Sequence, residues 1–225
     1  TIDSVSRPIF VAGIRSNTRN IRILNDTLGN PNDPTAWIAA SNIGAVHLRG
    51  VVNPIVRGCV VHGAESATNY QASGVRLDTC ENFTVERNWI YNIRYTGTSG
   101  WGSYGIFINL PASFIGSPNN VVSNNMIAGI SADGYASSTT GVWWISGIYV
   151  NSAAANPSSA LSIIHNSINL YGSYTGSSTS NGVSAGITLA PNIEGGVSVI
   201  GNLIQNIFKA ANNDTAQAIA ILTTN

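Results

Sequence analysis

The pentapeptide GVRLD at residues 74–78 decides the fold, because the chain repeats its pattern. The clearest copies are GIFIN at 105–109, GIYVN at 147–151 and GITLA at 186–190, with AVHLR at 45–49 and AIAIL at 218–222 as weaker copies. In each copy a small residue precedes two aliphatic residues that are separated by one variable position. Because side chains alternate between the faces of a strand, both aliphatic residues point to one side. The motif therefore predicts a short β-strand with one buried face.

A second motif ends in Asn: FTVERN at 83–88, NVVSNN at 120–125, LSIIHN at 161–166 and VSVIGN at 197–202. Earlier copies end at Asp26 and Cys59. One aliphatic residue lies three positions before this corner residue, and another lies two positions after it. Successive corners are separated by 33, 29, 37, 41 and 36 residues, so the length variation falls in loops. Internal repeats of this period are typical of solenoids.

These motifs predict an all-β fold, a right-handed single-stranded parallel β-helix of about six coils. Each coil would contain three short strands stacked on those of the previous coil, so that aliphatic residues form continuous columns. Asn suits the corner because it tolerates a left-handed backbone and its amide can both donate and accept between coils. We expect an Asn ladder there, interrupted by Cys59 and formed by Asp26, Asn88, Asn125, Asn166 and Asn202.

The composition bears on domain organisation and on partners. Hydrophobic residues make up 44% and charged residues 9%, with ten basic and ten acidic residues. A formal net charge of zero gives no field that would attract nucleic acid, and no apolar run is long enough to predict membrane insertion. We expect one β-helix domain over residues 1–225. Since neither end shows a capping segment, we expect an excerpt of a longer protein, with further coils or capping domains as partners.

The corner Asn with NSINLYG from Asn166, the GIYVN strands and the NLIQNI run from Asn202 resemble the pectate-lyase-like superfamily. More narrowly, they look like the repetitive secreted or cell-surface β-helix proteins of Bacteroidetes-type bacteria. The resemblance implies the fold and an extracellular or cell-surface location. It leaves function open, because the superfamily includes polysaccharide lyases, glycoside hydrolases, adhesins and inactive stalks.

Four residues on the outward face of the GVRLD-type strands are candidates for catalysis: His47, Arg49, Arg76 and Asp78. One interpretation is β-elimination on a uronic-acid polymer, in which Arg76 or His47 removes a proton and Arg49 neutralises the sugar carboxylate. The other is a cross-coil ion pair between Arg49 and Asp78, and a second such pair is expected between Arg57 and Glu86. A hydrolase with paired carboxylates is disfavoured, because this face carries only one acid.

Aromatic residues gather in the same region. Trp37, Trp101, Trp143 and Trp144 lie in segments that lead into these strands, and Phe107 and Tyr149 lie on their outward face. Such rings could stack on sugars or could close the loops over the sheet. The candidates for glycan binding are therefore Trp101, Phe107, Trp143, Trp144 and Tyr149.

No metal or cofactor motif stands out. Calcium is an alternative for the outward column Asp78, Asn109 and Asn151, but one carboxylate and two amides fit an amide ladder better. His62 and His165 lack partners at zinc-ligand spacing. Cys59 and Cys80 belong to different corners, which favours two free thiols over a disulfide.

The sequence thus favours a secreted or cell-surface structural or adhesive segment that contacts a polysaccharide or cell-surface glycan. The lack of paired carboxylates supports this interpretation over an enzyme. The alternative is a polysaccharide lyase that uses the four catalytic candidates His47, Arg49, Arg76 and Asp78.

Overall fold

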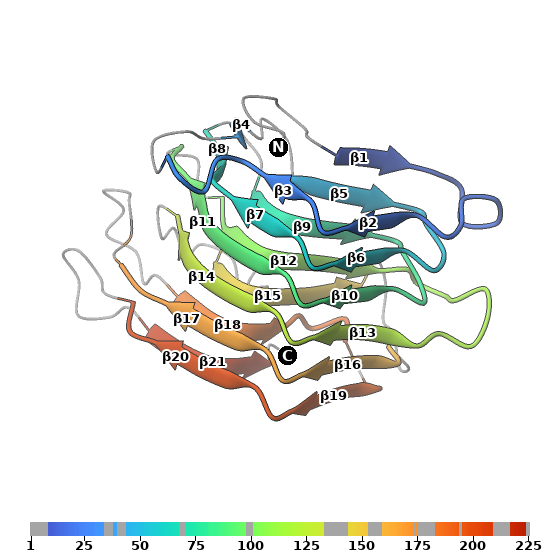
Figure 1. Cartoon of the computed structure of the whole chain (residues 1–225). Helices are drawn as coiled ribbons and strands as arrows, with labels where there is room; N and C mark the ends of the chain where they lie inside the picture. Colours follow the sequence, from blue (N-terminus) through green and yellow to red (C-terminus); the bar gives the residue numbers. More distant parts are fainter. Residues whose placement is uncertain are drawn as a thin grey trace.

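The computed structural model describes residues 9–33, 38–39, 44–67, 71–97, 101–132, 144–152, 159–172, 174, 183–193, 195–208 and 217–223. Within these ranges the chain forms strands, bridges and turns, and no helix. The predicted all-β class is therefore confirmed. Figure 1 shows the strands stacked as successive coils from β1–β3 at one end to β19–β21 at the other.

Three parallel sheets run the length of the stack. The first sheet contains β1 (Ile9–Ala12), β5 (Val46–Arg49), β9 (Ala72–Asp78), β12 (Ser103–Leu110), β15 (Ile145–Ser152), β18 (Val183–Leu189) and β21 (Gln217–Thr223). The second contains β2 (Arg22–Leu24), β6 (Ile55–Arg57), β10 (Thr84–Glu86), β13 (Asn120–Ser123), β16 (Leu161–Ile164) and β19 (Val197–Ile200). The third contains β3 (Thr27–Leu28), β7 (Val60–His62), β11 (Trp89–Tyr95), β14 (Met126–Ser131), β17 (Ser167–Leu170) and β20 (Leu203–Asn206), with β4 (Ile38–Ala39) and β8 (Ala64–Ser66) beside it.

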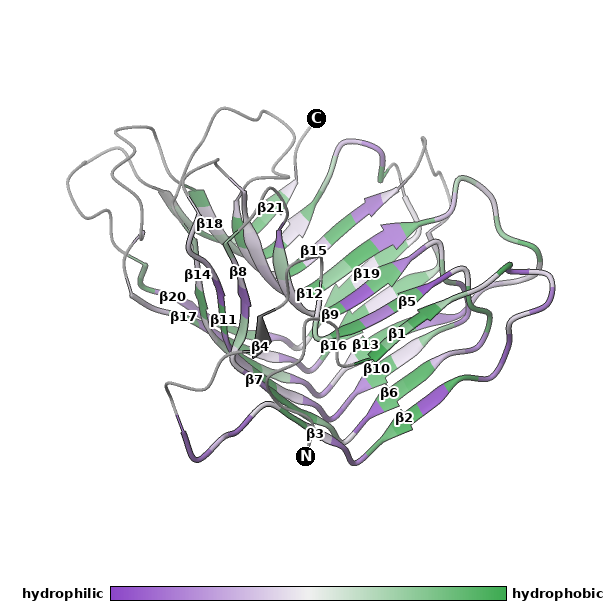
Figure 2. Cartoon of the chain, turned by 90° about the horizontal axis from the view of Figure 1, so that it is seen from above, coloured by the Kyte–Doolittle hydropathy of each residue, from purple (hydrophilic) through white to green (hydrophobic). Residues whose placement is uncertain are grey.

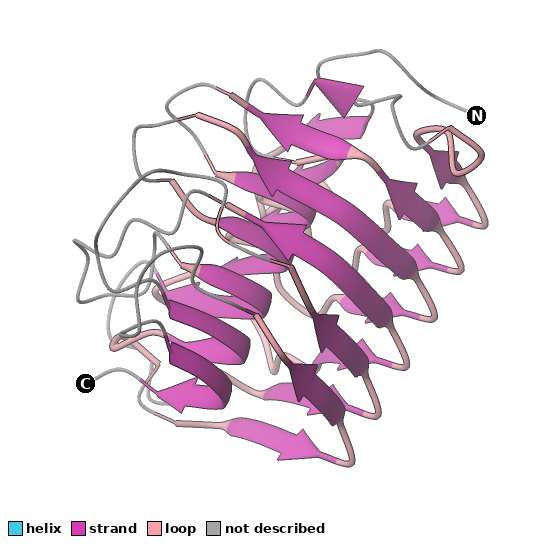
Figure 3. Ribbon diagram, turned by 90° about the vertical axis from the view of Figure 1, so that its left-hand side faces the viewer, coloured by secondary structure: helices cyan, strands magenta, loops and turns pink. Residues whose placement is uncertain are grey.

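One strand from each sheet makes a coil, so the predicted six coils are confirmed, and β21 begins a further turn. Figures 2 and 3 show the three sheets around a common interior and the coils stacked along one axis.

The predicted aliphatic columns point into this interior. The first-sheet register joins Val46, Val75, Ile106, Ile148 and Ile187 in one file. The second sheet joins Ile23, Val56, Val85, Val122, Ile163 and Val199. The third joins Leu28, Val61, Ile90, Ile127, Ile168 and Ile204. Members in the middle coils are fully buried, so each coil's apolar area is covered only because its neighbours stack on it.

The small residue of the GVRLD motif lies where the third sheet approaches the first. A Cβ built on Gly105 would lie 2.4 Å from Cγ2 of Ile127 and 2.6 Å from the carbonyl oxygen of Gly147. Gly74, Gly147 and Gly186 are in equivalent contacts. Glycine is required at these four positions because an added Cβ would come within 3.0 Å of an Ile side chain and a backbone carbonyl.

The last first-sheet strand differs from the expected register. Ile219 was expected opposite Ile187, but Ile221 pairs with Ile187 and Thr223 pairs with Leu189. The carbonyl oxygen of Ala220 faces Gly186, so the small-residue column continues at Ala220. A two-residue shift leaves each side chain on its expected face.

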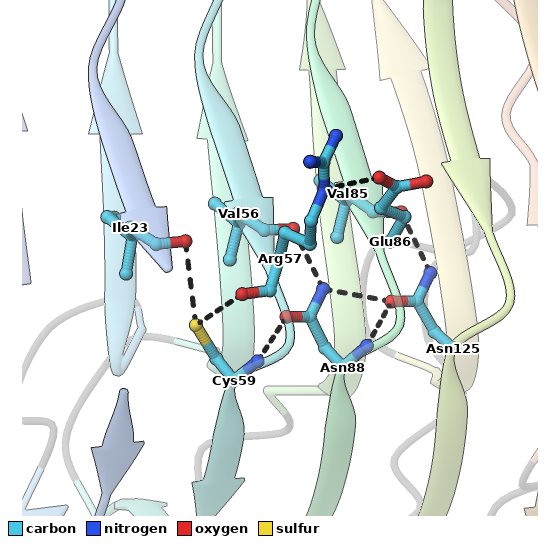
Figure 4. A network of polar contacts seen from close by, with 8 residues as sticks. All are labelled: Ile23, Val56, Arg57, Cys59, Val85, Glu86, Asn88 and Asn125. Atoms are coloured by element: carbon cyan, nitrogen blue, oxygen red, sulfur yellow. Dashed lines mark hydrogen bonds and ion pairs between the residues drawn. The ribbon is translucent and has the colours of Figure 1, made fainter. Parts of the chain in front are cut away.

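The Asn ladder is present at the corner between the second and third sheets (Figure 4). Asn88, Asn125 and Asn166 each donate through Nδ2 to Oδ1 of the next ladder Asn, at 2.9 Å in all three cases, and Asn202 is the last acceptor. The same Oδ1 atoms accept the backbone N–H of the preceding ladder residue at 2.9–3.1 Å. Nδ2 also donates to a carbonyl of the previous coil, as from Asn88 to Val56 at 3.0 Å. The buried amides therefore satisfy one another along the axis.

The ladder changes chemistry in the first two coils. The Cys59 thiol lies 3.6 Å from the Ile23 carbonyl oxygen, so it donates where a ladder Asn would use Nδ2. Asp26 occupies the next position, but its side chain is exposed and it joins coil 2 through its backbone carbonyl, which accepts from Val60 N–H. Cys59 and Cys80 are both free and buried, and burial raises the pKa of Cys80 to about 12.

The left-handed backbone expected at the ladder residue lies one position earlier, so that part of the prediction is wrong. Positive φ angles occur immediately before each ladder position, at Asn25, Gly58, Arg87, Asn124, His165 and Gly201. Asn is therefore needed at the corner for its amide, while the preceding residue makes the turn.

Candidate functional site

Three of the four predicted catalytic candidates meet on the outward face of the first sheet. Asp78 Oδ2 lies 2.7 Å from Nε2 of His47 and 2.7 Å from Nε of Arg76. Because a carboxylate only accepts, Nε2 of His47 donates this bond and Nδ1 is left as the other ring nitrogen. Burial alone would raise the pKa of Asp78, but the His47 hydrogen bond and the charge of Arg76 outweigh it and hold the pKa below its usual value.

Arg49 stays outside this cluster. It is adjacent to Asp78 in the β5–β9 register, yet its side chain is exposed, and no ion pair between them occurs among the described residues. The predicted Arg49–Asp78 pair is therefore wrong, because Asp78 turns to the neighbouring column, where His47 and Arg76 are shielded from water. The pair predicted between Arg57 and Glu86 is present (Figure 4).

The cluster is covered. His47 is only 3% exposed, the ring of Phe10 lies 4.9 Å from its ring, and the guanidinium of Arg76 lies 4.1 Å from the centre of the Phe107 ring. In the described part of the chain, His47 Nδ1, Arg76 Nη1 and Asp78 Oδ1 are buried without hydrogen bonds. The three side chains have the geometry for proton transfer, but His47 has little open surface at which to meet a polymer.

The outward aromatic residues of the first sheet are also buried. Tyr104, Phe107 and Tyr149 form a second apolar cluster, with ring centres 5.1–5.2 Å apart. Tyr149 is fully buried, and burial raises its pKa. These rings offer no exposed face to a sugar. Phe107 and Tyr149, two of the predicted glycan-binding candidates, are therefore covered.

The predicted Trp candidates are not part of that cluster. Trp101 packs against the main interior, and Trp144 is half-buried with its Nε1 lacking a hydrogen bond among the described groups. Trp37 and Trp143 lie outside the described residues.

The outward face of the third sheet carries a column with three exposed apolar residues. Trp89, Met126, Ser167 and Leu203 are aligned in one column, and Trp89, Met126 and Leu203 are 47%, 57% and 72% exposed. Together with the adjacent column they line a groove of about 290 Å³, which we call the third-sheet groove: Trp89, Met126, Ile127, Ala128, Ser167, Ile168, Asn169, Leu203 and Gln205. Among the residues that the structure describes, no charged side chain lines it.

The comparison with protein families agrees with this architecture. The sequence model described as "right handed beta helix region" matches residues 10–142. The chain belongs to the right-handed β-helix family. No significant match was found among curated proteins or solved structures. In this β-helix the parallel stacking continues beyond the matched region, since β16–β19 and β17–β20 keep the same register. The narrower likeness to pectate-lyase-like and Bacteroidetes proteins stays a prediction.

Trp89, which lines the third-sheet groove, stacks on Tyr91, which is not one of the lining residues. The ring centres of Trp89 and Tyr91 are 4.6 Å apart with an interplanar angle of 26°, and His62 lies against Tyr91 at 4.5 Å. Asn92 Nδ2 lies 2.9 Å from His62 Nε2, and burial lowers the pKa of His62. Because Trp89 directly follows a ladder Asn, the sequence could have revealed this column.

A second amide ladder exists, but it does not lie on the outward column of the first sheet, where the sequence predicts one. Asn109 pairs in register with Asp78 and Asn151, but no side-chain hydrogen bond links these three among the described contacts, and Asn109 Oδ1 is buried without one. The amide ladder predicted there is therefore wrong. Instead Asn82 donates to Asn53 and Asn53 to Asn20, at the exposed corner between the first and second sheets.

The part of the chain that the structure describes contains no group of three or more His, Cys, Asp or Glu arranged to hold a metal ion. The calcium alternative is not tested by this result. No long apolar helix that could cross a membrane occurs in the described ranges.

Proposed function

We propose that this chain is a structural or adhesive segment of a secreted or cell-surface protein that contacts neutral glycans through the third-sheet groove. The observation that carries the proposal is a groove that is lined by the exposed Trp89 ring and, among the described residues, by no charged side chain. Large exposed apolar patches mark interaction sites, and small-molecule sites combine apolar walls with a few polar groups.

The chemistry of the third-sheet groove fits a sugar. The exposed Trp89 ring supplies a flat apolar surface, while Asn169 and Gln205 supply amides that donate to and accept from hydroxyl groups. The absence of charge in the lining favours a neutral glycan over a uronic-acid polymer. The groove runs across adjacent coils, and this direction suits an extended chain.

The test is binding of the purified protein to an array of neutral and anionic oligosaccharides, followed by titration of the best ligands. We expect neutral ligands to bind, and Trp89→Ala to weaken them at least about tenfold, or ~1.4 kcal/mol. The matched control is Ile200→Ala, since Ile200 is 59% exposed on the second sheet and lies outside the groove. Binding that survives Trp89→Ala, or that is confined to anionic ligands, contradicts the proposal.

One observation favours a second function, β-elimination on uronic-acid polymers. His47, Arg76 and Asp78 form a connected cluster in which Nδ1 of His47 has no hydrogen bond among the described groups. The burial of His47 places this function second. Ultraviolet absorbance of an unsaturated product, formed from such polymers by the wild type and lost in Arg76→Ala, would establish it.

A further inference from the structure

Two long connections flank the corner between the first and second sheets. Residues 13–21 join β1 to β2 in coil 1, and residues 111–119 join β12 to β13 in coil 4. Coils 2 and 3, which lie between them, turn at the same corner through residues 50–54 and 79–83. Figure 1 shows both long connections extending beyond these shorter turns. Because successive coils are about 4.8 Å apart, the coils that carry the long connections are roughly 14 Å apart.

A buried carboxylate joins the two long connections. Glu81 is 4% exposed, and its Oε2 accepts the backbone N–H of Ile115 at 2.8 Å and lies 3.7 Å from Nη1 of Arg15. The same Nη1 atom donates to the Ser113 carbonyl at 2.6 Å. The charge of Glu81 is therefore balanced by Arg15, and hydrogen bonds to charged groups hold both connections in place.

A hollow between the two connections, here called the corner groove, has a volume of about 290 Å³. Its lining includes Arg19, Asn53, Asn82, Ile115, Ser117 and Pro118. The Arg comes from coil 1, the two Asn residues come from the turns of coils 2 and 3, and the other three residues come from coil 4. The volume is at the lower end of the range of small-molecule sites. Four successive coils therefore contribute to one small site.

The polar side chains of the corner groove present hydrogen-bond donors. Oδ1 of Asn53 accepts from Nδ2 of Asn82, and Oδ1 of Asn82 accepts the backbone N–H of Asn119. Each Nδ2 carries two protons and uses one of them in the ladder, so the second has no acceptor among the described contacts. Arg19 makes two long bonds of 3.4 Å to the Ser16 carbonyl and no ion pair among the described residues. The groove therefore offers unused N–H groups and one unbalanced positive charge.

We propose that the corner groove binds a small organic carboxylate, in which one carboxylate group is joined to a compact apolar body. The guanidinium of Arg19 and the spare amide protons of the ladder donate to the carboxylate oxygens. Ile115, which is 55% exposed, and Pro118 pack against the apolar body. A single negative charge fits better than a doubly charged phosphate ester. Arg19 is the one cationic residue among the described lining residues, and the carboxylate of Glu81 lies in the same groove.

The test compares N-acetyl-leucine with its uncharged amide in an NMR titration of the intact, isotope-labelled protein at low ionic strength. N-acetyl-leucine carries both the carboxylate and the apolar group, and it has the structure of a peptide terminus. Hexanoate carries the same two groups without a peptide bond, so it tells whether free acids are accepted as well as peptide termini. We expect saturable binding of N-acetyl-leucine. Its amide should bind at least about fivefold more weakly, because the hydrogen bonds to a charged acceptor are lost.

Two pairs of variants locate the ligand. Arg19→Gln should weaken the binding of N-acetyl-leucine about fivefold or more. Its matched control is Arg22→Gln, which removes the same charge from an exposed residue outside the lining and should preserve binding. Ile115→Ala should weaken binding because it removes an apolar wall, while Ile14→Ala, at a residue that is 70% exposed and outside the lining, should preserve it.

All four changes are made at exposed residues, and thermal unfolding checks that the variants fold. Trp89→Ala should leave the binding of N-acetyl-leucine unchanged, because Trp89 lines the third-sheet groove and not the corner groove. The two sites can therefore fail separately. Equal binding of the acid and its amide, equal effects of the two Arg changes, or binding of inorganic phosphate without binding of either acid would each overturn the proposal.

Discussion

The outward faces of the first and third sheets are built by the same stacking and yet have opposite character. On the first sheet, His47, Phe107 and Tyr149 are buried, and the charges of Arg76 and Asp78 are paired. On the third sheet, Trp89 and Met126 are exposed, and no charged side chain is found among the described residues that line the groove. Outward orientation in a coil therefore does not establish that a side chain is accessible.

The connections that precede the strands differ in the same way. Third-sheet strands follow the ladder corner directly, whereas long segments separate β14 from β15 and β17 from β18. The exposed residues Trp89 and Met126 come directly after the ladder residues. The coil pattern fixes the direction in which each side chain points. Whether that side chain is buried depends on residues outside the pattern.

The largest expected effect is the loss of unfolding free energy when a buried ring is removed from the outer face of the first sheet. Tyr149→Ala should lower the free energy of unfolding by roughly 3–5 kcal/mol, because it leaves a cavity in the outer cluster. Trp89→Ala, an aromatic truncation on the exposed face, should cost less than about 1.5 kcal/mol. Denaturant unfolding of both variants measures the contrast. Similar losses would mean that the two faces are equally packed.

The next effect concerns charge. Asp78→Asn should destabilise the fold by roughly 1–3 kcal/mol at neutral pH, because His47 and Arg76 lose a charged acceptor. The folded-state pKa of Asp78 is depressed, so its contribution is fully present above the unfolded pKa of about 3.9 and is lost as pH falls through the folded value. The difference between wild type and variant should therefore shrink in acid. Arg49→Ala is the control and should change stability by less than about 0.5 kcal/mol.

The smallest effect belongs to the third-sheet groove. Leu203→Ser should change the free energy of unfolding by about 0.5 kcal/mol or less, since the side chain is 72% exposed. The same change should weaken glycan binding, because it removes one apolar wall of the groove. A large loss of stability would show that this face is covered in solution.

Much of the interior could be predicted because each coil repeats the same local pattern. The files through Val75 and Val85 and the hydrogen bonds of Asn88 follow from spacing alone. The site could be predicted only in part. His47, Arg76 and Asp78 do meet, but the choice of Arg76 over Arg49 as the partner of Asp78 depends on which side chain is shielded from water.

The sequence by itself determined the coils, the aliphatic files and the ladder, because stacking like on like is a short-range rule that the repeat spells out. Only the tertiary structure decided the two-residue shift of β21, the closing of the first-sheet face and the opening of the third-sheet groove. These depend on how particular side chains and connections pack between coils. Such packing has no period and so leaves no repeating signal in the chain.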